Sequence, residues 1–322
     1  MGIVHHSQSV HCALVVCVAQ SSKRKDVEDM TRTITDILKD DGLSGVLRCD
    51  VNDYRAIPRM NASSIKPGLI GTTEVDANLI RAAFEGTSAE PSSTLQDSFD
   101  RGSLAHCILF EPDWLLTRFA VWTGKKRGGQ DWNEFTAENT GKTIMRDCDV
   151  RAVQHACREF RKVPEIGEIL KRKHDTELSV VGQVGRTFCK GTLDFITTDS
   201  GPVTLVDLKT TRTGIDEASV LRTVRSLKYR EQLAFYAQLY KQATGREVAA
   251  TYLLFVSLDD VGVRLVKLTT SALQFGFSRM VQAIEAVEKC IDSDSWPTFF
   301  GQSVCDVSEY EIGEIPLEGF DE

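Results

Sequence analysis

The chain lacks several features that would assign it at once to a class. It has no apolar run long enough to span a bilayer, so we expect no membrane association. Residues 12–19 are apolar, but no Lys or Arg precedes them, which favours a strand or helix over a signal peptide. The nine cysteines form no Cys-x-x-Cys pair and are odd in number, as is typical of reduced, mostly buried thiols. We therefore expect a cytoplasmic protein.

Positive charge is also in short supply. The 322 residues include 38 Lys and Arg against 46 Asp and Glu, a net charge of −8, which excludes a uniformly basic protein that coats nucleic acid. Residues 303–322 hold seven of the acids and no Lys or Arg, so the remainder is close to neutral and can still carry a local basic groove. Apolar residues make up 42% and charged residues 26%, which excludes a disordered chain.

The order of predicted elements indicates an α/β (α+β) fold with a mixed central β-sheet flanked by helices. Hydrophobic periodicity predicts early helices at 27–39 and 77–84, and an apolar helical segment at 102–110. A cluster of turn residues at 199–202 separates two of the later strands. The later elements are one or two helices at 148–170, strands at 178–184, within 186–197 and at 203–209, a helix at 225–243, strands at 251–257 and 263–268, and a helix at 272–291.

Two acids and a lysine in the predicted hairpin carry the chemistry. If the turn at 199–202 joins the strands, Asp194 faces Asp207 on one surface of the sheet. Two ionised carboxylates so close repel each other, so one takes up a proton or a cation lies between them. Lys209 shares this face, since alternate strand residues point the same way. The carbonyl of Leu208 adds another oxygen ligand, a donor set that suits Mg²⁺ or Mn²⁺.

This arrangement suits phosphodiester hydrolysis. A bound divalent ion lowers the pKa of a water molecule and neutralises charge on the phosphate, while the ammonium of Lys209 can hold that water in line with phosphorus. The pattern alone is also compatible with a surface hairpin that carries scattered charges, because Asp and Lys are common on strand faces.

Further candidates lie outside the hairpin. Glu177, which we place just before a strand, could reach the ion or could be a solvated acid. His106 interrupts an apolar helical run and could be a core residue or a ligand. Tyr229, Gln232 and Tyr236 share one helix face, which could simply pack on the core. An amide on a packing face needs a partner, and a phosphate or a role in positioning the nucleophile would supply one for Gln232.

The motifs around these candidate residues resemble those of a known family. GxxxDFI…VxDLKTT at 191–211, followed by YREQxAFY at 229–236, resembles the PD-(D/E)xK nuclease superfamily. More narrowly, the chain resembles the exonuclease VIII (RecE-type) C-terminal nuclease domain of phage and prophage recombination systems. The likeness spans about residues 50–300. Its other landmarks are MNASSI at 60–65, DRGSLAHCILFEP at 100–112, TGKT at 140–143 and Trp296-Pro297.

The resemblance implies a restriction-endonuclease-like core and a set of site residues. It implies metal ligation by His106, Asp194, Asp207, Leu208 and Glu177, and catalytic roles for Lys209, Asp207, Asp194, Glu177, Gln232 and Tyr229. It divides the chain into a variable extension at 1–45, a nuclease domain at 46–302 and an acidic tail at 303–322.

The implied activity is a Mg²⁺- or Mn²⁺-dependent 5′→3′ exodeoxyribonuclease. Such an enzyme acts on linear double-stranded DNA ends and leaves 3′ single-stranded overhangs for recombination. The resemblance also implies a ring-shaped homo-oligomer and a single-strand annealing protein of RecT type as partner, in the cytoplasm of a bacterial or phage-infected cell.

Three alternatives stay open. The first is an endonuclease with the same core. The second is a CRISPR-associated-type nuclease with an iron–sulfur cluster, which needs three cysteines grouped late in the chain; only Cys290 and Cys305 lie there, so no such cluster is expected. The third is an inactive module that binds DNA ends, which the presence of Asp194, Asp207 and Lys209 disfavours.

DNA contact should be made mainly with the phosphate backbone, since an exonuclease accepts any sequence. Any single basic residue could equally belong to an ordinary solvated face. The acidic tail could occupy the DNA groove when DNA is absent, or simply aid solubility. The candidate DNA-binding residues are Lys125, Lys126, Arg127, Arg212, Arg222, Arg225, Lys228 and Arg230.

Overall fold

The computed structural model describes residues 13–15, 44–48, 51–86, 92–160, 162–211, 214–257 and 262–297. The predicted helix at 27–39 and the acidic tail lie outside these residues. Within them, none of the helices combines the length and the apolar character that crossing a bilayer requires.

A seven-stranded sheet forms the centre of the molecule, with the strand order β1-β2-β7-β8-β9-β10-β11. Every neighbouring pair is antiparallel except β9 and β10, which run parallel, so the predicted mixed sheet is confirmed. The strands are β1 (Ala13–Val15), β2 (Gly45–Arg48), β7 (His174–Val184), β8 (Thr187–Thr197), β9 (Val203–Thr211), β10 (Val248–Ser257) and β11 (Gly262–Lys267).

The turn between β8 and β9 sets the register that the sequence predicts. Phe195 lies opposite Val206 and Ile196 opposite Leu205, the pairing expected for a turn centred at 199–202. Asp199 closes this turn by accepting a hydrogen bond from the Gly201 amide at 2.9 Å.

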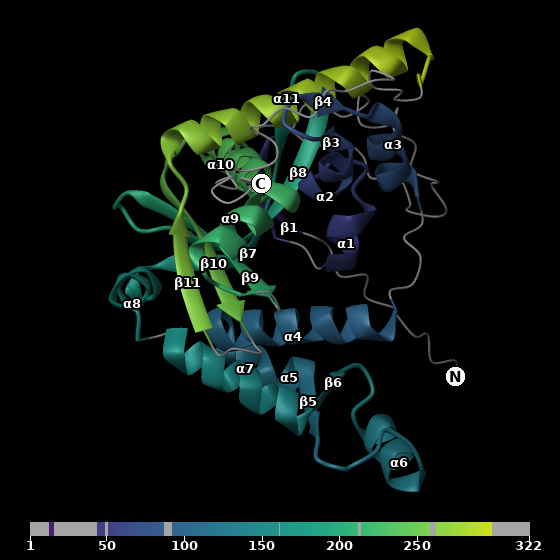
Figure 1. Ribbon diagram of the computed structural model, residues 1–322, viewed down its shortest axis with the longest axis vertical. Coiled ribbons are helices and arrows are strands. Elements are labelled where there is room, and N and C mark those ends of the chain that lie inside the picture. The colour runs from purple at the N-terminus through teal and green to yellow at the C-terminus, as the bar shows by residue number, and fades with distance from the viewer. Residues whose placement is uncertain are drawn as a thin grey trace, which may run out of the picture.

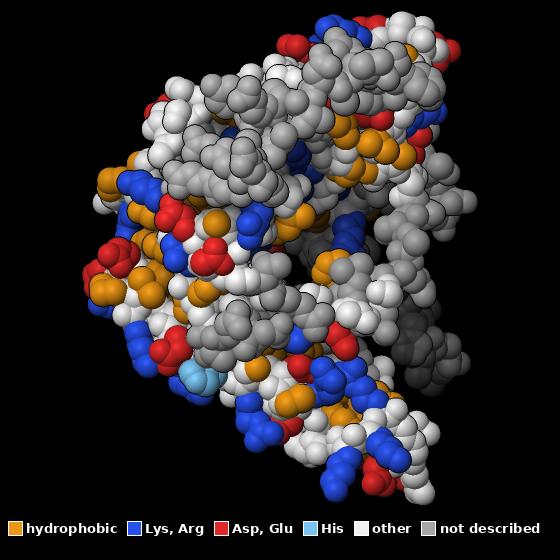
Figure 2. Space-filling model, in the orientation of Figure 1, with side chains coloured by type: hydrophobic (Ala, Val, Ile, Leu, Met, Phe, Trp, Pro, Cys, Tyr) orange, Lys and Arg blue, Asp and Glu red, His pale blue; other side chains and the backbone are white. Residues whose placement is uncertain are grey.

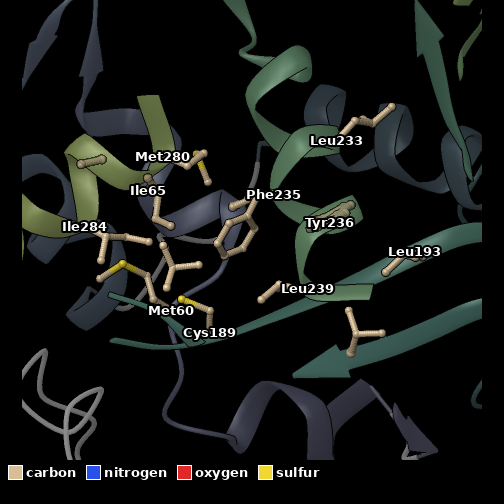
Figure 3. Close-up of a cluster of buried hydrophobic side chains, with 14 of the residues drawn as sticks. Met60, Ile65, Cys189, Leu193, Leu233, Phe235, Tyr236, Leu239, Met280 and Ile284 are labelled. Atoms are coloured by element: carbon tan, nitrogen blue, oxygen red, sulfur yellow. The ribbon is translucent and has the colours of Figure 1, made fainter. Parts of the chain in front are cut away.

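Helices cover one face of the sheet around a large apolar core (Figure 1). These helices are α2 (Ala62–Ile65), α3 (Ala77–Glu85), α10 (Tyr229–Thr244) and α11 (Thr270–Ser293). Figure 3 shows Ile65, Phe235 and Ile284 from three of them in one cluster of buried side chains, which also includes Leu193 of β8, and Phe235 is fully buried. Burying a side chain of this size stabilises the fold by about 1.5–3 kcal/mol.

A second core packs against the opposite face and contains Phe160, Phe195 and Val256. It is covered by α4 (Ser93–Phe110), α7 (Asp147–Phe160) and α8 (Pro164–Lys171), with α4 and α7 side by side in Figure 1. The remaining elements are α1 (Val51–Ala56), β3 (Leu69–Ile70), β4 (Glu74–Val75), α5 (Leu115–Arg118), β5 (Phe119–Trp122), α6 (Gln130–Glu138), β6 (Thr143–Arg146), α9 (Glu217–Ser226) and the 3₁₀ turns η2 (Lys66–Gly68) and η3 (Pro112–Trp114).

Two expected elements differ from the structure. The single helix expected at 225–243 is two helices, α9 and α10, because Lys228 adopts the left-handed conformation (φ 53°) and breaks the chain of helical hydrogen bonds. The strand β7 begins at His174, four residues before its predicted start, so Glu177 lies inside a strand and not ahead of one.

Candidate active site

The site lies where β8 and β9 separate. The described ladder between the two strands consists of the Phe195–Val206 and Ile196–Leu205 pairs, and Asp194 is the next residue along β8. Its Oδ2 accepts a hydrogen bond from the Leu208 amide at 2.9 Å, in place of a strand partner. The N–H and C=O of one strand residue point to the same side, so the Leu208 carbonyl also faces this opening.

The strand that contains Asp194, β8, and the neighbouring strand β7 both depart from regular geometry. Leu193 and Ile196 both contribute to the core beneath α10, whereas strict alternation would send them to opposite faces. In β7, Glu177 falls between the pairs Thr176–Phe195 and Leu178–Leu193, which places it across from Asp194. Glu177 has φ 48°, a left-handed conformation that costs a non-glycine residue about 1–2 kcal/mol. Strain of this kind concentrates at functional sites.

Asp207 and Lys209 share the face that packs beneath α10, as predicted. The Asp207 side chain is 1% exposed, and its Oδ2 forms an ion pair with Lys209 Nζ at 2.6 Å. Its Oδ1 accepts a hydrogen bond from Gln232 Nε2 at 3.3 Å. The Lys209 ammonium also lies 4.8 Å from the centre of the Tyr229 ring, a favourable cation–π contact. We call Asp194, Asp207 and Lys209 the acid–lysine cluster.

The charges in this cluster are unbalanced. The pKa of Asp207 is raised to about 6, because burial and the carboxylate of Asp194 raise it more than the Lys209 ammonium lowers it. Burial also raises the pKa of Asp194. Burial alone would lower the pKa of Lys209, but the two carboxylates outweigh it and raise that pKa. Within the cluster one ammonium faces the carboxylates of the buried Asp207 and the half-buried Asp194, and this excess of negative charge favours a bound cation. The Lys66 ammonium, which lies outside the cluster, also lowers the pKa of Asp207.

A second group, the histidine cluster, consists of His106, Glu111 and Glu177. His106 Nε2 lies 3.2 Å from Glu177 Oε1, and its Nδ1 lies 3.9 Å from Glu111 Oε2. One ligand atom from each of the three residues falls within 4.8 Å of the others. Loss of water contact raises the pKa of Glu177; His106 lowers it and Asp194 raises it, so the two clusters adjoin.

The donor atoms fit a divalent cation. His106 Nε2 and Asp207 Oδ2 are buried polar atoms whose nearest neighbours are charged groups, Glu177 Oε1 at 3.2 Å and Lys209 Nζ at 2.6 Å. Each has a lone pair free for a metal. Carboxylate and carbonyl oxygens with one imidazole suit Mg²⁺ or Mn²⁺. Glu111 is a weaker candidate ligand, because Arg118 Nη1 lies 2.5 Å from its carboxylate.

Sequence reasoning missed three residues of the site. Glu111 lies beside His106 and pairs with Arg118, and it stands within the quoted motif DRGSLAHCILFEP, where its spacing from the histidine was a usable signal. Lys66 donates a hydrogen bond to Gln232 Oε1 at 2.6 Å. The two residues are 166 positions apart, so no local sequence pattern predicts this contact. The amide of Gln232 therefore finds its partners, Lys66 and Asp207, within the protein.

The candidate DNA-binding residues fall into two groups. The first, 125–127, is exposed in the segment between β5 and α6, at the end of the molecule where Figure 2 shows several Lys and Arg side chains. In the second group, Arg222 and Arg225 are exposed on α9. Arg212 lies outside the described residues.

The other two basic candidates have partners in the protein, as do Arg127, which donates to the Ile144 carbonyl, and Arg222, which donates to Ser219. Lys228 Nζ donates to the Gly71 carbonyl at 3.0 Å. Arg230 pairs with the buried Glu231 at 2.8 Å and stacks on Phe275, so it is less available to DNA than we expected.

Comparison with known proteins agrees with this geometry. Residues 78–310 match the family described as "PDDEXK-like domain of unknown function (DUF3799)". The chain belongs to this PDDEXK-like family. The matched segment includes His106, Asp194, Asp207 and Lys209. The match confirms the predicted membership of the PD-(D/E)xK superfamily. No curated protein matches the sequence.

A solved structure supports the fold assignment of this PDDEXK-like chain. It is a protein from Eubacterium rectale described as a "Putative exonuclease", with 13% identity and a TM-score of 0.54 over 83% of this chain and 98% of that one. It confirms the restriction-endonuclease-like fold. Protein VC1899 from Vibrio cholerae aligns at 13% identity over 64% of this chain and 54% of its own, with a TM-score of 0.21, too low to add to the argument.

Proposed function

We propose that this PDDEXK-like domain is a Mg²⁺- or Mn²⁺-dependent 5′→3′ exodeoxyribonuclease that acts on linear double-stranded DNA ends and leaves 3′ single-stranded overhangs. The observation that carries the hydrolytic part is the acid–lysine cluster, buried where β8 and β9 separate. The resemblance of the chain to RecE-type nucleases supports the exonucleolytic part, as it does a ring-shaped homo-oligomer and an annealing protein of RecT type as partner.

The residues present would divide the work as follows. Asp194, Asp207, the Leu208 carbonyl, His106 and Glu177 would hold the ion, and when bound it lowers the pKa of water and neutralises phosphate charge. Lys209 is placed to donate a hydrogen bond to the attacking water. The ring of Tyr229 restrains that ammonium, because the cation–π contact favours one position of the side chain.

Backbone contacts would position the DNA. The exposed residues at 125–127 and on α9 are candidates for phosphate binding, which carries no sequence information and so suits an enzyme that accepts any sequence.

The test is digestion of a linear duplex labelled at one 5′ end or at one 3′ end, with Mg²⁺, with Mn²⁺ and with EDTA. We expect early release of the 5′ label, retention of the 3′ label on long fragments, and no release in EDTA. A covalently closed circle of the same sequence is the matched control and should survive. Cleavage of the circle would contradict the exonuclease and favour the endonuclease, and metal-independent cleavage would contradict the mechanism.

A further inference from the structure

Three elements that are distant in the sequence meet at Gln232. Lys66 in η2 donates to Gln232 Oε1 at 2.6 Å, and Gln232 Nε2 on α10 donates to Asp207 Oδ1 on β9 at 3.3 Å. The side chain of Gln232 therefore connects Lys66 to one of the two acids of the acid–lysine cluster.

The chemistry of the three groups permits a single orientation of the amide. An ammonium can only donate hydrogen bonds and a carboxylate can only accept them, whereas an amide has one end of each kind. If the amide turned over, its NH₂ would face the Lys66 ammonium and its oxygen would face the Asp207 carboxylate. Gln232 is 8% exposed and Asp207 1% exposed, so water could not repair that mismatch.

The orientation of this amide bears on Asp207. Because Gln232 holds Oδ1, the other carboxylate oxygen, Oδ2, stays directed at Lys209, whose Nζ lies 2.6 Å away. The amide thus fixes which oxygen of Asp207 faces a cationic group, and the lone pair of Oδ2 that Lys209 does not use is the one that a metal ion would take. Partners that hold a metal ligand in this way commonly change metal affinity or activity by about 10–100-fold when they are removed.

Lys66 belongs electrostatically to the same site. Its pKa is lowered to about 8, because burial and the ammonium of Lys209 lower it more than the carboxylates of Asp207 and Glu231 raise it. Its Nζ also lies 5.4 Å from the centre of the Tyr229 ring, the ring that Lys209 approaches.

We propose that Lys66 is a positioning residue of the active site, which acts through Gln232 to fix the Asp207 carboxylate for the divalent ion. The proposal rests on the proposed metal-dependent function, and it assigns a role to the short segment that follows α2. Lys66 touches neither substrate nor metal in this scheme.

The experiment is a double-mutant cycle on the full chain, with Mn²⁺ affinity measured by isothermal titration calorimetry. We expect Lys66→Met and Gln232→Met each to weaken Mn²⁺ binding by about 10-fold. The double variant should bind no more weakly than the weaker of the two single variants, because each change breaks the same connection. Lys66→Arg, which keeps the charge and the donors, should retain most of the affinity.

Controls separate this role from general stability. Lys171→Met removes an exposed lysine of α8 that pairs only with Glu168 among the described contacts, and it should leave Mn²⁺ affinity unchanged. Thermal melting of each variant checks that it folds. If Lys66→Met does not fold, Lys66→Leu, which also lacks a donor, takes its place in the cycle. Wild-type affinity in the Lys66 variant, or losses that add in the double variant, would overturn the proposal.

Calorimetry needs no turnover, so the two proposals can fail separately. A wild-type chain that binds Mn²⁺ and shows the coupled losses, yet degrades no DNA, would contradict the proposed function alone. An active nuclease with additive losses would contradict the role of Lys66 alone.

Discussion

Asp194 and Asp207 set the chemistry of the site at the scale of single residues. Asp207 is buried and Asp194 half-buried, both have raised pKa values, and one ammonium, that of Lys209, lies against Asp207. A folded protein tolerates such a surplus of buried negative charge when a cation or a proton offsets it. The roles of the acids and of the lysine can therefore be separated by substitution.

Replacement of Lys209 should uncouple metal binding from turnover. We expect Lys209→Ala to bind Mn²⁺, because both acids remain, but to lose about 100-fold or more of the cleavage rate, because the group that holds the water is gone. Asp207→Ala should lose Mn²⁺ binding and activity together. Calorimetry and the end-labelled duplex assay measure the two effects. Normal turnover by Lys209→Ala would show that its assigned role is wrong.

The raised pKa of Asp207 predicts how metal binding depends on pH. Below about pH 6 the carboxyl group is mostly protonated, so an incoming ion must displace the proton. Mn²⁺ affinity should be nearly constant above about pH 7 and should fall about tenfold per pH unit, for each displaced proton, below pH 6. Titration calorimetry from pH 5 to pH 8 measures this. Constant affinity down to pH 5 would mean that Asp207 has the pKa of an ordinary carboxyl group.

Single residues also show what the sequence could predict. The short turn fixes the register of Phe195–Val206 and Ile196–Leu205 locally, which made it predictable that Asp194, Asp207 and Lys209 lie near one another. The expected pairing of Asp194 with Asp207 is not part of the described ladder, because Asp194 accepts a hydrogen bond from the Leu208 amide instead. The contact of Lys66 with Gln232 was not, because it depends on how η2 and α10 pack across 166 positions.

At the scale of elements, the site depends on the separation of β8 from β9 and on a left-handed residue within β7. β8 and β9 separate beyond Phe195, which lets the Asp194 side chain reach the Leu208 amide. β7 carries the left-handed Glu177 across from Asp194. Periodicity predicted these strands, but it carries no information about a backbone angle, so Glu177 was placed ahead of β7 and not within it.

The conformation of Glu177 gives a prediction about stability. Glu177→Gly removes the side chain and the left-handed strain, whereas Glu177→Ala removes the carboxylate and keeps the strain. We expect the Gly variant to exceed the Ala variant by about 0.5–1 kcal/mol in free energy of unfolding, the strain relief exceeding the extra entropy of glycine. Both should bind Mn²⁺ more weakly than the wild type. Urea denaturation measures the difference, and an Ala variant as stable as the Gly variant would argue against strain.

At the scale of the whole molecule, the net charge of −8 means that the proposed DNA binding would depend on limited regions. The exposed candidate DNA-binding residues lie on separate elements, at 125–127 and on α9. The fold class was predictable because the order of strands and helices fixes it. The helical partners of each face depend on long-range packing, and the sequence did not specify them.

Removal of the acidic tail tests how charge governs DNA binding. Deletion of residues 303–322 removes seven negative charges and no positive ones, so we expect tighter binding of duplex DNA at low salt. The difference should shrink above about 0.5 M salt, where charges are screened within a few ångströms. Fluorescence anisotropy with a labelled duplex measures both affinities. Equal affinity at low salt would rule out competition between the tail and DNA.

The most direct test of the account is a crystal structure of the full chain soaked with Mn²⁺, with anomalous scattering recorded to locate the ion. The account predicts an ion between Asp194 and Asp207, within bonding distance of both carboxylates and of the Leu208 carbonyl. Crystals in which these two acids hold no Mn²⁺, or in which the ion binds elsewhere on the protein, would contradict it.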